Sequence, residues 1–125
     1  MYKIAFGKIS ALFNAISSVE KLYVPTDKVD IAVFAEYRDG VALTQKLNTN
    51  RSAKDFFFPQ TENLYDVKMK DKKIEITDTR EECEDFVIFG VRACDVRSFS
   101  ILDKVYLADP IDSYYKNSRD HGTII

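Results

Sequence analysis

The chain has few of the residues from which a metal centre is usually built. It contains two cysteines, Cys83 and Cys94, one histidine, His121, and no tryptophan among its 125 residues. The cysteines do not form a Cys-x-x-Cys pair, and structural metal or iron–sulfur sites usually take four ligands. We therefore expect no closed metal site made by this chain alone, and we assign no metal-binding residue.

Long apolar runs and an excess of basic residues are also missing. No window approaches the roughly 18 apolar residues of a membrane span, and no secretory signal is visible at the N-terminus. The 18 Lys and Arg residues face 20 Asp and Glu residues, with both signs interspersed. That balance argues against nucleic-acid binding. We expect a cytoplasmic protein with reduced cysteines, no membrane insertion and no nucleic-acid partner.

The remaining composition fits one domain with its own core. Of the 125 residues, 46% are hydrophobic, which is ordinary for a globular domain of this length. Apolar residues recur at helical spacing over residues 8–20, which predicts an amphipathic helix. Residues 21–27 form a short extended segment in which Pro25 prevents the helix from continuing.

Two hairpins are expected. In the first, residues 31–37 and 41–47 alternate on either side of Asp39-Gly40, a pair that suits a two-residue turn with positive φ. In the second, residues 65–69 face residues 74–76 across a charged loop. Together with the helices, the hairpins predict an α/β (α+β) domain with a mixed sheet.

The segment from Phe86 to Phe89 is continuously apolar and predicts a strand buried on both faces. Gly90 follows it, and Asp95 is a suitable N-cap for a helix. The expected inward side chains of that helix are Val96, Phe99, Leu102 and Tyr106. Asp109-Pro110 ends this helix, a short helix or turn follows, and the final apolar triplet begins a strand. An apolar triplet at the end suggests that the sequence is part of a longer protein.

The junction between the buried strand and the helix has the densest group of charged residues. Open α/β sheets place ligand sites at the carboxyl ends of central strands, where a helix N-terminus offers free N–H groups. Arginines there suit phosphate or carboxylate, and a cysteine thiolate would be favoured at the same place. The candidate cofactor-binding residues are Gly90, Arg92, Cys94, Asp95 and Arg97.

From spacing alone, a structural role for the same residues is favoured over a functional one. Asp95 then only caps the helix, Cys94 is a small buried residue, and either arginine pairs with a nearby acid. The stretch is not a phosphate-binding loop, since it has neither a second glycine nor a Gly-Lys-Ser/Thr ending. No nucleophile–base pair or carboxylate pair is visible, so we assign no catalytic residue.

Two aromatic segments are candidates for an interface. Three phenylalanines precede Pro59, after a Ser52 that can cap a short helical turn. Exposed apolar clusters are uncommon on monomers, although at least two of these rings are expected to anchor the loop in the core. A second aromatic group lies near the C-terminus. The expected interface residues are Phe58, Pro59, Gln60, Tyr114, Tyr115 and Arg119.

Three stretches, "AKDFFFPQTENLY", "FVIFGVRACDVRSFSILDKVYL" and "DPIDSYYKNSRD", together resemble the amino-terminal part of a family of iron–sulfur redox subunits. The family includes the anaerobic sulfite reductase A subunit and the sulfhydrogenase β subunit. The residues that fit its motifs are Lys54, Phe58, Pro59, Gln60 and Glu62, then Gly90, Val91, Arg92, Cys94 and Asp95, then Asp109, Pro110, Tyr114, Tyr115 and Arg119. Ala93 replaces a proline that is usual in the family, and one extra residue follows Pro110.

The resemblance rests on residues 51–125, since residues 1–50 match only in general character. In that family a carboxyl-terminal ferredoxin-like module with two 4Fe–4S clusters follows, and electrons pass to or from a flavin subunit. The resemblance implies that residues 1–125 are a single accessory N-terminal domain without a cofactor of its own. The clusters would lie in the module beyond it, and the partners would be flavin-containing and catalytic subunits.

Three functional hypotheses follow. The first is a cluster-free N-terminal domain of an iron–sulfur electron-transfer subunit in an anaerobic oxidoreductase of sulfite reductase or hydrogenase type. Such a domain docks partner subunits and positions the cluster module, as a component rather than a complete enzyme. The alternative is a small-anion or nucleotide-binding module built on residues 90–97. A stand-alone enzyme using Cys94 would need a base, and none is identifiable.

Overall fold

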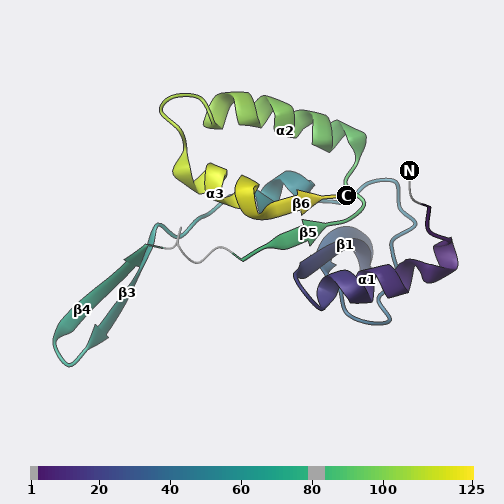
Figure 1. The fold of residues 1–125 in the computed structure, drawn as a ribbon, viewed down its shortest axis with the longest axis horizontal. Helices are drawn as coiled ribbons and strands as arrows, with labels where there is room; N and C mark the ends of the chain where they lie inside the picture. The colour runs from purple at the N-terminus through teal and green to yellow at the C-terminus, as the bar shows by residue number, and fades with distance from the viewer. Residues whose placement is uncertain (1–2, 79–83) are drawn as a thin grey trace.

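A computed structural model describes residues 3–78 and 84–125 of the chain (Figure 1). Cys83, expected to be reduced, lies outside the described residues. The elements are the 3₁₀ turn η1 (Phe6–Lys8), α1 (Ile9–Ser17), β1 (Lys21–Lys28), β2 (Ile31–Glu36), the 3₁₀ turn η2 (Ala53–Phe56), β3 (Tyr65–Lys70), β4 (Lys73–Asp78), β5 (Phe86–Ile88), α2 (Ala93–Tyr106), α3 (Ser113–His121) and β6 (Gly122–Ile124).

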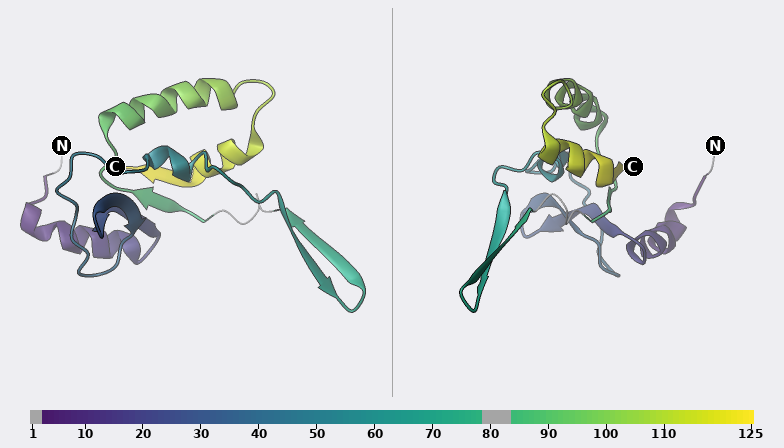
Figure 2. Two further views of the ribbon diagram at one scale, coloured as in Figure 1. Left: turned by 180° about the vertical axis from the view of Figure 1, so that it is seen from behind. Right: turned by 60° about the vertical axis from the view of Figure 1, so that its left-hand side comes forward.

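The central sheet is mixed and has the strand order β2-β1-β5-β6. β1 pairs with β2 in antiparallel fashion, whereas β1 with β5 and β5 with β6 are parallel. Helices α2 and α3 lie on one side of this sheet and α1 lies on the other (Figures 1 and 2). The predicted α/β (α+β) fold class, with its mixed sheet, two hairpins and flanking helices, is confirmed.

Side-chain alternation along β1 and β5 divides the core into two clusters. Leu22, Val24 and Val87 point toward α1, where they pack with Phe13 and Tyr37. The intervening residues point to the other face, because successive side chains of a strand alternate. The second cluster consists of Ala53, Phe57, Ile88, Phe99 and Tyr115. The sheet is therefore covered on both faces, which explains why β5 is apolar at every position.

The strand-to-helix junction forms where the sequence predicts it. Gly90 follows β5 with a φ of +80°, a conformation that non-glycine residues rarely adopt. A Cβ atom at Gly90 would lie 3.2 Å from Cγ of Pro25. The turn therefore requires glycine both for its dihedral angle and for its close contact with β1.

The first predicted hairpin is wrong in its pairing. β2 pairs with β1, with Lys28 opposite Ile31, rather than with residues 41–47. The turn at Gly40 does form, with a φ of +86° and a hydrogen bond from Val41 N to Arg38 O of 3.0 Å. The chain then returns to the other edge of β1, where Leu43 forms an isolated bridge with Thr26.

Pro25 explains why this pairing is difficult to predict. Proline is depleted within strands because it cannot donate to a ladder. In β1, the carbonyl of Pro25 accepts a hydrogen bond from Thr44 N at 2.9 Å, on the edge opposite β2. The missing N–H of Pro25 faces this same edge, beyond the end of β5, so the ladder to β2 loses no hydrogen bond. A proline is therefore tolerated inside β1.

The second predicted hairpin is confirmed. β3 and β4 form a separate two-stranded sheet in which Val67 lies opposite Ile76 and Met69 lies opposite Ile74. The turn residues Asp71 and Lys72 have φ values of 49° and 66°. This ribbon extends away from the rest of the domain in each view (Figures 1 and 2).

Helix α2 packs on the sheet through a narrower face than predicted. Phe99 is 2% exposed, and Leu102 and Tyr106 pack against the same cluster. Val96 was expected on this face, but it is 44% exposed, so that part of the prediction is wrong. The reason is that successive helical side chains turn by about 100° around the axis, which puts Val96 on the far side of Phe99 from Leu102 and Tyr106. Within residues 3–78 and 84–125, no helix is both long and apolar enough to cross a membrane.

The close approach of β6 to the second cluster gives a stability prediction. An ideal Cβ at Gly122 would lie 2.2 Å from Cε1 of Phe57 and 2.8 Å from Cζ of Phe86. Gly122→Ala should therefore displace one of two packed rings and lower the free energy of unfolding by roughly 1–3 kcal/mol. Thermal unfolding followed by circular dichroism measures this as a Tm lower by several degrees.

Gly7→Ala is the matched control, because a Cβ at Gly7 meets nothing within 4 Å. Its Tm should stay close to that of the wild type. Equal Tm values for the Gly122→Ala and Gly7→Ala variants would contradict the packing of β6 against Phe57.

Candidate functional site

The first turn of α2 is built differently from the prediction for Asp95. The N-cap is Arg92, whose backbone is extended and whose side chain makes no capping hydrogen bond, so Asp95 is not the cap. Asp95 is instead the third helical residue, and its carboxylate faces η2. It accepts hydrogen bonds from Ser52 Oγ at 2.8 Å and Lys54 Nζ at 3.3 Å. A carboxylate in the first helical turn remains favourable because of the helix dipole.

Ser52 fulfils its predicted role in the same place. Its side chain accepts a hydrogen bond from Lys54 N and thereby caps η2. Because Ser52 Oγ also donates to Asp95, one hydroxyl connects the start of η2 to the start of α2. The ion pair of Lys54 with Asp95 therefore joins the first sequence motif to the second.

Three of the five candidate binding residues line one small cavity. Its volume is about 180 Å³, and Gly90, Arg92 and Asp95 contribute to its wall. The other lining residues are Pro25, Phe34, Thr44, Lys46 and Thr49. Cys94 is an exposed free cysteine and Arg97 is exposed on α2, and neither is among the lining residues.

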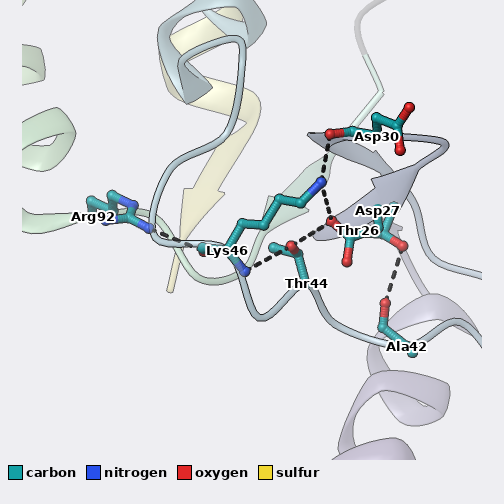
Figure 3. Close-up of polar contacts among 7 residues, drawn as sticks. All are labelled: Thr26, Asp27, Asp30, Ala42, Thr44, Lys46 and Arg92. Carbon is teal, nitrogen blue, oxygen red and sulfur yellow. Dashed lines mark hydrogen bonds and ion pairs between the residues drawn. The ribbon is translucent and has the colours of Figure 1, made fainter.

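The loop after Gly40 contributes Thr44, Lys46 and Thr49 to the cavity lining. Figure 3 shows the polar contacts that Thr44 and Lys46 make. Lys46 Nζ reaches the carbonyl of Asp30 and lies 3.7 Å from the carboxylate of Asp27. Thr44 Oγ1 donates to the same carboxylate at 2.7 Å. Arg92 Nη2 approaches the carbonyl of Lys46 at 3.5 Å, a long and exposed contact. The loop is therefore attached to the turn between β1 and β2.

The cavity combines features that suit a small anion. Arg92 is cationic, and Thr44 and Thr49 provide hydroxyl groups. The ammonium group of Lys46 contacts Asp30 and Asp27, so its charge is already paired. The carboxylate of Asp95 opposes an anion, but its charge is balanced by Lys54 at 3.3 Å. Sequence reasoning missed Thr44 and Lys46, because it placed residues 41–47 in a strand, and it missed Thr49 in the polar segment that follows. The polar run after Leu43 was the available signal.

The third motif forms a partly buried ion pair rather than part of this cavity. Arg119 donates two hydrogen bonds to Asp103, from Nε to Oδ1 at 2.9 Å and from Nη2 to Oδ2 at 3.1 Å. Tyr115 Oη donates to Oδ1 of Asp103 at 2.7 Å. The hydrogen bonds from Arg119 hold the pKa of Asp103 below its ordinary value, and Tyr115 adds to this effect. Burial and the bond to Asp103 raise the pKa of Tyr115.

Aromatic rings surround this ion pair. The Arg119 guanidinium lies 5.1 Å from the ring centroid of Phe57 and 5.7 Å from that of Phe99. Cation–π contacts of this kind are stabilising when the cation is partly desolvated. Arg119 of α3 therefore contacts α2 and Phe57, the residue after η2, and its charge is satisfied within the domain.

The predicted interface residues are divided between the core and the surface. Tyr115 is 2% exposed, so its contacts lie inside the domain. Phe58 is 46% exposed and packs on Tyr106 with a centroid distance of 4.8 Å. Pro59 and Gln60 lie beside it, and Tyr114 Oη donates to the carbonyl of Leu64 at 3.1 Å. As predicted, Phe56 and Phe57 anchor the loop in the core.

The described residues do not fit an iron–sulfur cluster. A cluster is usually held by four cysteines, and residues 3–78 and 84–125 contain one, Cys94. In that part of the chain, no group of three or more His, Cys, Asp or Glu residues could hold a metal ion. His121 pairs with Asp85 at 2.7 Å.

The Asp103–Arg119 pair gives a prediction for pH dependence. The pKa of Asp103 is lowered in the folded state, so its contribution to stability is present above the ordinary carboxyl pKa of about 4. That contribution is lost as the pH falls through the lower, folded-state value. Asp103→Asn should therefore destabilise the protein at pH 7, and the difference from the wild type should shrink as the pH falls from 5 toward 3. Urea unfolding across this range measures it.

Asp39→Asn is the control, because Asp39 is exposed in the turn before Gly40. It should leave stability nearly unchanged at each pH. A difference between wild type and Asp103→Asn that stays constant from pH 7 to pH 3 would contradict the ionic role of Asp103.

Comparison with known proteins shows that this chain is similar in sequence to a hydrogenase subunit. It is 32% identical over 115 residues, 90% of its length, to the sulfhydrogenase 2 subunit beta of Pyrococcus furiosus. The chain spans 33% of the length of that relative. No protein-family profile and no solved structure matches it. The resemblance predicted from the three motifs is thus confirmed, and the chain is related to one third of a sulfhydrogenase β subunit.

Proposed function

We propose that this chain is an accessory, cluster-free domain of an iron–sulfur electron-transfer subunit in an oxidoreductase complex. Its role is to dock partner subunits and to position the module that carries the clusters. It acts as the N-terminal domain of such a subunit, in the cytoplasm, and it is a component of an enzyme rather than a complete one. Flavin-containing and catalytic subunits are the partners.

The similarity to a sulfhydrogenase β subunit carries this proposal, since it extends over 90% of the chain. The described residues supply a scaffold rather than a redox centre, because Cys94 is their only cysteine. The motif residues that the structure brings together make internal links, as Lys54 does with Asp95 and Arg119 does with Asp103. A domain of this kind contributes to a complex through the surfaces with which it binds other subunits.

A domain exchange tests the docking role. The matched third of the Pyrococcus furiosus subunit is replaced by this chain, and the chimera is produced together with the other subunits of that complex. The chimera should co-purify with them, because the exchanged domain supplies an equivalent scaffold. A variant in which the matched third is simply deleted should co-purify at least tenfold less. Affinity purification with quantitative mass spectrometry measures both.

The deletion variant decides between a docking domain and a dispensable one. If it assembles as well as the chimera, the domain is not needed for docking and the proposal fails. A chimera that is folded but does not assemble also contradicts the proposal.

A second candidate function is binding of a small anion or nucleotide at the α2 N-terminus. The observation that favours it is the cavity of about 180 Å³ lined by Arg92, Lys46 and Gly90. Helix N-termini with adjacent cations are suited to anions. The volume suits a phosphate or carboxylate group rather than a whole nucleotide, because cofactor pockets are usually 300–1,000 Å³.

Calorimetric titration with inorganic phosphate and with flavin and nicotinamide nucleotides tests this candidate. The wild type should bind phosphate, and Arg92→Ala should weaken binding at least tenfold through loss of a charged donor. Arg97→Ala is the matched control, because Arg97 is exposed outside the cavity lining. If the wild type binds none of these ligands, the candidate is excluded.

A further inference from the structure

One face of the β3–β4 ribbon carries five apolar side chains, with Asp78 opposite Tyr65 at its base. Tyr65, Val67 and Met69 of β3 share this face with Ile74 and Ile76 of β4, as the register requires. The exposed fraction of each of the five side chains lies between 56% and 78%. This is an exposed apolar surface of the type that marks interaction sites on soluble proteins.

The opposite face of the ribbon is polar. Lys68 lies opposite Glu75 there, and Asp66 lies opposite Thr77. The tip, residues 70–73, contains three lysines and one aspartate. The ribbon is therefore amphipathic, so its apolar face is a specific feature of β3 and β4 rather than a general excess of hydrophobic residues.

A hydrogen bond at the base of the ribbon joins it to the domain. Tyr114 Oη of α3 donates to the carbonyl of Leu64, the residue before β3. From there the strands extend away from the sheet and helices, as both figures show (Figures 1 and 2). An isolated two-stranded hairpin is marginally stable in water, and packing of one face is what usually stabilises it. The apolar face thus requires a cover that residues 3–78 and 84–125 do not provide.

The length of the relative indicates what this cover is. The chain spans 33% of the sulfhydrogenase β subunit that it matches, so two thirds of such a subunit have no counterpart in the structure. We propose that the apolar face of the β3–β4 ribbon docks onto this remaining two thirds. This inference rests on the proposed function and names the surface by which the domain is attached. The complementary surface is apolar, with acidic residues where the lysine-rich tip lies.

Thiol labelling of the two faces tests this inference. Met69→Cys places a thiol on the apolar face and Lys68→Cys places one on the polar face, both with Cys83→Ser and Cys94→Ser. Each variant is prepared as the chain alone and within the chimeric β subunit described above. Reaction with a maleimide is followed at each position by peptide mass spectrometry.

In the chain alone, both thiols should react at similar rates. In the chimera, the thiol of Met69→Cys should react at least tenfold more slowly than in the chain alone, whereas that of Lys68→Cys should change by less than threefold. If Met69→Cys reacts equally fast in a chimera that assembles, the inference fails while the proposed function stands. If the chimera does not assemble with its partners, the proposed function fails and the inference with it.

Two further measurements on the chain alone test whether a second copy of the chain or a membrane covers the apolar face instead. Protection of Met69→Cys that increases with protein concentration means that a second copy covers the face, and it overturns the inference. Protection by vesicles of anionic phospholipid means that the face binds a membrane surface, and it also overturns the inference. Labelling that is independent of concentration and of vesicles is the expected result.

Discussion

The guanidinium of Arg119 is the group on which the α2–α3 side of the domain depends. It makes a two-point contact with Asp103 and lies over the rings of Phe57 and Phe99. Asp103 and Phe99 belong to α2 and Phe57 follows η2, while Arg119 itself belongs to α3. A partly buried cation is tolerated only when it is paired and hydrogen-bonded. The positions of these three segments are therefore mutually dependent. A shift of any one of them would expose the Arg119 guanidinium to water or leave it without its ion-pair partner.

Several of the motif residues by which the chain resembles the iron–sulfur redox subunits have a structural role of this kind. Lys54 pairs with Asp95, so the loop before the β3–β4 ribbon is fixed to the start of α2. Tyr115 and Arg119 converge on Asp103, so α3 is fixed to the middle of α2. These residues lie far apart in the sequence and close together in the fold. They fix the base from which the β3–β4 ribbon extends.

Much of the fold could be predicted from local patterns. The apolar run of β5, Gly90 after it and the periodicity of α2 are each local, and the structure agrees with them. The pairing of β1 with β2 could not be predicted in this way, because it depends on which edge of β1 the carbonyl of Pro25 faces. Asp95 illustrates the same limit. Its position near a helix start suggested capping, but its contacts with Ser52 and Lys54 involve residues more than 40 positions away.

The candidate site was predicted in part for related reasons. Gly90, Arg92 and Asp95 lie within six residues of one another in the sequence, so they could be recognised as one junction, and they do line one cavity. Lys46 could be placed beside them only after the return of the loop to β1 was known. Cys94 and Arg97 share the junction in sequence, but helical geometry turns successive side chains by about 100° around the axis. They therefore face solvent while their neighbours face the cavity.

The unequal lengths of β1 and β5 have a consequence for the origin of this cavity. β1 has eight residues and β5 has three, which pair with Lys21, Leu22 and Tyr23. The carboxyl-terminal half of β1 thus has no regular strand on that edge, and the irregular segment around Leu43 and Thr44 lies there instead. An irregular segment fills this space less completely than a strand would. The cavity beside Arg92 therefore lies where the regular pairing of β1 with β5 ends, so its size depends on the length of β5 as well as on the side chains that line it.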